Sequence, residues 1–99
     1  MEISKNKSGS ELVISLSGRL NTVSAPMFEE EIRSSIDGVT ELVLDFSNLE
    51  YMSSAGLRIL LSTQKVMNKQ GKMTVRNVNA TIMDIFEITG FTDFLTIEN

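Results

Sequence analysis

Two adjacent serines, Ser53 and Ser54, are the residues of this 99-residue chain best placed for chemistry. They follow a strand-like segment at 41–46 and come just before a helix-like segment at 57–68. The first N–H groups of a helix lack intrahelical partners, and the helix dipole adds partial positive charge at that end. A phosphate on either hydroxyl would be electrostatically tolerated there, so the pair is a candidate phosphorylation site.

The same position also suits a purely structural role. Serine is a favoured N-cap residue, and it stabilises a helix by about 1 kcal/mol relative to alanine. A Ser-Ser pair at the start of a helix is more often a cap than a regulatory site. The residue types alone leave both interpretations open.

The chain lacks the residues that most catalytic sites use. It has no His and no Cys, which removes Ser-His-Asp and Cys-His arrangements and the usual zinc ligand sets. Its six glycines stand apart from one another, so there is no glycine-rich loop to hold a phosphate. The acidic run 29–31 lies in a helical pattern, where consecutive side chains point in different directions. We therefore expect no enzyme activity, no metal and no cofactor.

Composition restricts the class of protein further. We expect one domain, residues 1–99, that folds, because 41% of the residues are hydrophobic and 22% are charged. The net charge is −4 and the nine basic residues are scattered, which disfavours direct binding of nucleic acid. No apolar run approaches the roughly 20 residues of a membrane span. The N-terminus lacks the apolar core of a signal peptide, so the predicted location is the cytoplasm.

Alternating hydrophobicity predicts the first strands. Residues 11–20 alternate apolar and polar side chains, the pattern of a strand with one buried face. A turn at 7–10 precedes this strand, so residues 2–6 are expected to form its hairpin partner. The run Leu42–Leu44 is continuously apolar, which suits a central strand covered on both faces.

A helix is predicted over 24–36, ending at 37–38, where glycine favours termination. Pro26 falls in its first turn, where the missing N–H costs little. Thr22 and Ser24 are candidate caps for this helix. The apolar residues that recur at helical spacing are Ala25, Phe28, Ile32 and Ile36.

The second half of the chain repeats the alternation of helix and strand. A helix from 54 is stopped by Gly71, a strand covers 72–76, and a helix runs between Asn79 and Gly90. A terminal strand is expected over 94–97. The order is β-β-α-β-α-β-α-β, in which strands joined by single helices pair in parallel with right-handed crossovers. The predicted fold class is α/β, with a mixed, mainly parallel sheet covered by helices.

Two segments carry a resemblance to a known family. Segment 44–58 reads LDFSNLEYMSSAGLR, and segment 18–26 reads GRLNTVSAP. With these motifs the chain resembles STAS-domain proteins of the bacterial anti-sigma factor antagonist type over essentially its whole length. The family pattern has a hydrophobic strand, a short loop and then Asp-Ser-Ser/Thr/Ala-Gly-Leu, with a Gly-x-Leu-Asp loop before the first helix.

The resemblance implies a position for the phosphate. The phosphoacceptor serine of the family falls on Ser54, which precedes Ala55 and the Gly-Leu pair. Ser53 and Asn21 stand where many relatives have Asp, so two carboxylates are absent from this region. Ser53 is also a rival acceptor that relatives with Asp do not offer. The implied partner-binding residues are Asn21, Thr22, Ser24, Ser53, Ser54, Gly56, Leu57 and Arg58.

The resemblance also implies a function. The unphosphorylated protein would bind an anti-sigma factor, a serine kinase of the histidine-kinase-like ATPase fold, and so free the sigma factor. The kinase would phosphorylate Ser54 and release the antagonist, and a metal-dependent serine phosphatase would reset it. The alternative is a non-switching STAS interaction module in a transport or stress-signalling complex, in which Ser54 is only an N-cap.

Overall fold

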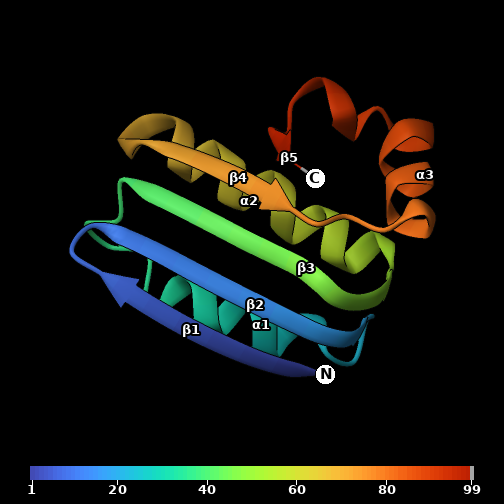
Figure 1. Cartoon of the computed structure of the whole chain (residues 1–99), viewed down its shortest axis with the longest axis horizontal. Helices are drawn as coiled ribbons and strands as arrows, with labels where there is room; N and C mark the ends of the chain where they lie inside the picture. Colours follow the sequence, from blue (N-terminus) through green and yellow to red (C-terminus); the bar gives the residue numbers. More distant parts are fainter. Residues whose placement is uncertain (99) are drawn as a thin grey trace.

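The computed structural model describes residues 1–98 and confirms the predicted order of elements (Figure 1). A short 3-10 turn, η1, precedes the last strand. In chain order the elements are β1 (Glu2–Ser8), β2 (Glu11–Leu20), α1 (Ala25–Arg33), β3 (Glu41–Met52), α2 (Ser54–Gln70), β4 (Lys72–Arg76), α3 (Ala80–Thr89), η1 (Phe91–Asp93) and β5 (Ile97–Glu98).

The strands form one mixed sheet in the order β1-β2-β3-β4-β5. The β1–β2 pair is antiparallel and the other pairs are parallel, as predicted. β3 lies in the middle, so Leu42–Leu44 belong to a central strand. In Figure 1, α1 and α2 lie behind the sheet, and α3 stands beside the ends of β3 and β4.

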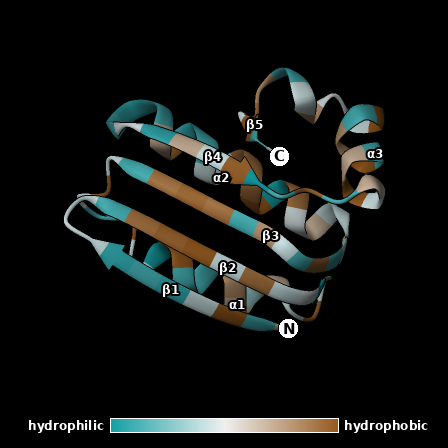
Figure 2. Ribbon diagram, viewed as in Figure 1, coloured by the Kyte–Doolittle hydropathy of each residue, from teal (hydrophilic) through white to brown (hydrophobic). Residues whose placement is uncertain are grey.

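The hydrophobic core lies between the sheet and the helices α1 and α2. Leu42 and Leu44 pack into it, and Val43 on the opposite face is also only 3% exposed, so β3 is covered on both faces. Figure 2 shows the hydrophobic bands in the middle of β2 and β3, while much of the edge strand β1 is hydrophilic. The largest fully buried side chains include Phe28, Phe46 and Phe86.

The helix α1 ends at Arg33, about one turn earlier than predicted. Just after it, the N–H groups of Ser35 (3.0 Å) and Ile36 (2.9 Å) both donate to the carbonyl oxygen of Ile32, so the last turn tightens and the regular helix ends. The side-chain amide of Gln70 then donates to the carbonyl oxygens of Ile36 (2.9 Å) and Val39 (2.6 Å). The Val39 N–H also donates to the Ile36 carbonyl (3.0 Å), which closes a turn. These carbonyls are therefore bound by groups outside the helix.

The strand β3 continues to Met52, so the prediction that it ends at residue 46 is wrong. The sequence pattern is broken by polar residues after Phe46, yet pairing with β2 continues to the Leu20–Met52 pair. The register shifts between Ser15 and Ser17 and again after Gly18. Such bulges accept extra residues in one strand without ending the ladder.

The C-terminal elements differ slightly from prediction. The helix α3 has its expected cap, because the Asn79 side chain accepts a hydrogen bond from the Ile82 N–H (2.8 Å). The last strand, however, is Ile97–Glu98 rather than 94–97. Phe94 instead follows η1, where its ring lies 4.7 Å from that of Phe91. Aromatic packing therefore takes the place of strand pairing there.

Candidate functional site

The two serines at the start of α2 have different roles. Ser53 is the N-cap, with extended backbone, and its hydroxyl accepts a hydrogen bond from the Ala55 N–H (3.3 Å). Ser54 is the first residue of the helix, and it is exposed. The interpretation of Ser54 as the cap is therefore wrong, because β3 and its pairing end one residue before Ser53.

The loop after β2 lies directly against this helix start. The Ser53 N–H donates to the carbonyl oxygen of Leu20 (2.9 Å), which joins the two segments. The side-chain oxygen of Asn21 accepts hydrogen bonds from the N–H groups of Val23 and Ser24, both at 3.0 Å. Asn21 is thus the residue that organises the loop, in the manner of an Asx turn.

Ser24 occupies the N-cap position of α1 but makes no capping hydrogen bond with its side chain. Its hydroxyl instead donates to the Arg19 carbonyl (2.8 Å) and accepts from the Asn21 N–H (2.9 Å). Thr22 lies exposed at the tip of the same loop. The loop is therefore held by its own side chains, with Thr22 presented to solvent.

Gly56 and Leu57 lie on the side of α2 that packs against the sheet. Gly56 is buried where α2 crosses β2 and β3, and a Cβ atom there would lie 2.7 Å from the Leu20 side chain and 2.8 Å from that of Met52. Leu57 is 8% exposed and belongs to the core. Both residues fix the first turn of α2 on the sheet, while Ser54 and Arg58 remain on its outer side.

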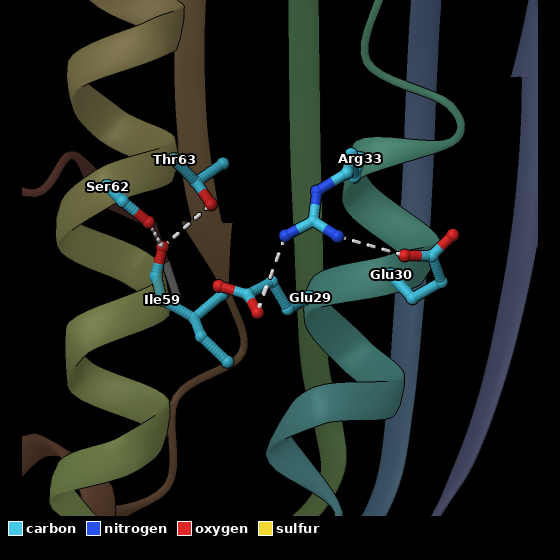
Figure 3. Close-up of polar contacts among 6 residues, drawn as sticks. All are labelled: Glu29, Glu30, Arg33, Ile59, Ser62 and Thr63. Atoms are coloured by element: carbon cyan, nitrogen blue, oxygen red, sulfur yellow. Dashed lines mark hydrogen bonds and ion pairs between the residues drawn. The ribbon is translucent and has the colours of Figure 1, made fainter.

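A hollow lies between α1 and α2, and Ala55 is its lining residue nearest the start of α2. We call it the inter-helix hollow, and Arg58 and Ile59 border it from α2. A second hollow between the same helices shares Glu29, Ile59 and Ser62 with it. Figure 3 shows the polar contacts there, where Ser62 and Thr63 both donate to the Ile59 carbonyl and Arg33 pairs with two glutamates of α1. The residues that line the hollow next to the site are Thr22, Ala25, Pro26, Glu29, Ala55, Arg58, Ile59 and Ser62.

A carboxyl group on β3, outside the site, has a shifted pKa. The carboxyl group with a clearly shifted pKa is Asp45 on β3. Burial opposes its ionisation, but hydrogen bonds from the Ser47 N–H and the Asn77 amide, helped by the charge of Arg76, outweigh burial and lower the pKa. Within residues 1–98, no three acidic residues come together as a metal site. None of the described helices is long and apolar enough to cross a membrane.

Replacing Ser53 with alanine should destabilise the fold more than replacing Ser54. Ser53→Ala removes the cap hydrogen bond, which is worth about 1 kcal/mol, or about 4–8 °C in Tm for a domain of this size. Ser54→Ala removes an exposed hydroxyl and should change stability by about 0.5 kcal/mol at most. Thermal unfolding followed by circular dichroism measures both, and equal Tm values would contradict this assignment of the cap.

The fold is an α/β domain with an exposed serine at the start of a helix. The chain belongs to the STAS domain family, whose sequence model matches residues 2–99, and within it to the anti-sigma factor antagonist type. A protein of Bordetella bronchiseptica named "Putative anti-sigma factor antagonist BtrV" is 32% identical over 101 residues, which cover 100% of this chain and 87% of that protein. The anti-sigma-B factor antagonist of Bacillus subtilis is 26% identical over 88 residues, covering 88% of this chain and 81% of that protein.

Solved structures agree with this assignment. The crystal structure of an anti-sigma factor antagonist from Mycobacterium paratuberculosis has a TM-score of 0.90 and 26% identity, and covers 98% of this chain and 84% of that chain. The unphosphorylated form of the anti-sigma factor antagonist SpoIIAA has a TM-score of 0.85 at 20% identity, and covers 99% of this chain and 89% of that chain. At that identity the second likeness concerns the fold alone.

The structure adds two features that the sequence did not reveal. The guanidinium carbon of Arg19 lies 4.8 Å from the centre of the Tyr51 ring, a cation–π contact that depends on the shifted register of β2 and β3. The inter-helix hollow depends on how α1 and α2 pack. Neither feature has a local sequence signal, because each joins residues that are distant in the chain.

Proposed function

We propose that this protein is an anti-sigma factor antagonist whose binding to an anti-sigma factor serine kinase is switched off by phosphorylation of Ser54. The observation that carries this proposal is the difference between the two serines. Ser53 has its oxygen engaged as the cap, whereas Ser54 is exposed at the first position of α2. A kinase can therefore reach Ser54 without breaking the helix start.

In the proposed cycle the kinase transfers the γ-phosphoryl group of ATP to Ser54 Oγ, which loses its proton, and ADP leaves. The phosphate adds about 1.5 to 2 negative charges and three acceptor oxygens. A partner surface packed against Ser54 would have to desolvate that charge or meet it with cations. A serine phosphatase would hydrolyse the phosphoserine with water and restore the binding form.

The fold supports a switch that acts at the surface. SpoIIAA has been solved in its unphosphorylated and phosphorylated forms, and this chain matches both, with TM-scores of 0.85 and 0.77. Ser54 lies on the outer side of α2, away from Leu57 and the core. A phosphate at Ser54 would therefore change the charge of the binding surface and leave the packing in place.

The partner surface should comprise the loop 18–24 and the first turns of α2. Titrating the isotope-labelled protein with its kinase should perturb the NMR signals of Asn21, Thr22 and Ser54 most strongly, because these residues lie at the joined loop and helix start. Perturbations confined to the opposite ends of the strands, near Gly38 before β3 and Gly71 before β4, would contradict the proposed surface. Binding without any phosphate transfer from ATP would instead support the non-switching interaction module.

A further inference from the structure

Arg58 lies four residues after Ser54 on the same helix. Residues at this spacing share one helix face, with Cβ atoms about 6 Å apart. Helical side chains also tilt toward the N-terminus of their helix. An arginine at position 58 can therefore reach back over the turn that Ser54 begins.

The surroundings of Arg58 leave its side chain available for a new partner. It borders the inter-helix hollow, whose lining extends from Thr22 in the loop before α1 and Ala55 in the first turn of α2 to Ser62 further along α2. The side chain of Arg58 is exposed, and it makes no ion pair within residues 1–98. Glu29 supplies the carboxylate that lines the same hollow, and its Oε1 lies 3.6 Å from Nη2 of Arg33, with which it pairs.

We propose that Arg58 is the intramolecular counter-ion of phosphorylated Ser54, and that phosphorylation thereby withdraws from the surface a basic side chain that otherwise binds an acidic group of the partner. This inference rests on the proposed phosphorylation of Ser54. A guanidinium group binds phosphate oxygens through two parallel hydrogen bonds. An anion that precedes a cation by four residues is also the favourable order on a helix.

The modification then has two effects on the kinase complex. It places negative charge at the contact, and it also removes the positive charge that Arg58 offers to the partner. A simple repulsion by the phosphate would need only the first effect. The two cases differ in what happens when Arg58 is replaced.

The pairing is tested in the protein alone, with phosphoserine incorporated at position 54 during synthesis so that no kinase is needed. Phosphorus NMR titration gives the pKa of the phosphate, whose ordinary second value is about 6. We expect this pKa to lie about 0.3 pH units or more below that of the Arg58→Gln variant, because the paired cation favours the dianion. Arg58→Lys should restore part of the difference.

Lys65→Gln is the matched control, since Lys65 is an exposed basic residue of α2 that lies eleven residues from Ser54. It should leave the pKa of the phosphate unchanged. Equal pKa values in the parent and in Arg58→Gln would overturn the pairing. The pairing would also be overturned if Lys65→Gln raised the pKa of the phosphate as much as Arg58→Gln does. That result would show a general effect of the charge on α2.

The withdrawal of Arg58 from the partner is tested by measuring the affinity of four proteins for the kinase. They are the parent and Arg58→Gln, each with serine or phosphoserine at position 54. Phosphoserine should weaken kinase binding in both proteins, but the factor of weakening should be about threefold smaller in Arg58→Gln than in the parent. The reason is that Arg58→Gln has already lost the positive charge that phosphorylation withdraws. Equal factors would overturn the withdrawal. If phosphoserine weakens neither protein, the proposed switch itself fails, while the phosphorus titration still decides whether Arg58 holds the phosphate.

Discussion

Ser54→Ala should abolish phosphate transfer from the kinase and leave a protein that stays bound to it. The Ser53 hydroxyl remains in this variant, but its oxygen accepts the Ala55 N–H and caps the helix. Ser53 is also only partly exposed, so a kinase reaches its hydroxyl less readily than the exposed hydroxyl of Ser54. Incubation with kinase and ATP, followed by mass-spectrometric mapping of the site, measures the labelling.

Two variants accompany this experiment. Ser53→Ala should still be labelled at Ser54, although it is less stable. Ser54→Asp should bind the kinase weakly, yet melt within a few degrees of the parent, because an exposed substitution changes stability by about 0.5 kcal/mol. Phosphate found on Ser53, or labelling that persists in Ser54→Ala, would show that the acceptor is not Ser54.

Gly71→Ala should cause a large loss of stability, about 3 kcal/mol, which lowers Tm by about 15 °C. Gly71 ends α2 where it passes close to the backbone at the start of β3. An added Cβ would overlap the carbonyl oxygen of Thr40 and lie 2.6 Å from its carbonyl carbon. That oxygen also accepts the Lys72 N–H (3.0 Å), so the clash cannot be relieved without loosening the start of β4.

Gly90→Ala separates this clash from the general effect of losing a glycine. Gly90 has a left-handed backbone, with φ of 79°, but nothing lies within 4 Å of an added Cβ. The expected loss there is about 1 kcal/mol, which comes from backbone strain alone. Thermal or urea unfolding compares the two variants with the parent. A smaller loss for Gly71→Ala than for Gly90→Ala would contradict the close approach of Gly71 to Thr40.

Local sequence patterns determined the identity and order of the elements. The alternation over 11–20 and the apolar run 42–44 specify strands because side chains alternate across a sheet. The Asn79 cap depends on a backbone N–H only three residues away. The motif around Ser54 likewise lies in one continuous segment, so its resemblance to the family could be read directly.

Tertiary structure alone decided which serine is the cap. The position of the cap depends on where the ladder between β2 and β3 ends, and that ladder continues through two register shifts to Met52. The segment after α1 is held by Gln70, which is 34 residues from Ile36 in the chain. The position of Arg58 over the inter-helix hollow depends on the packing of α1 against α2. Each of these outcomes arises from contacts between distant segments, whose geometry no local pattern of hydrophobicity or propensity records.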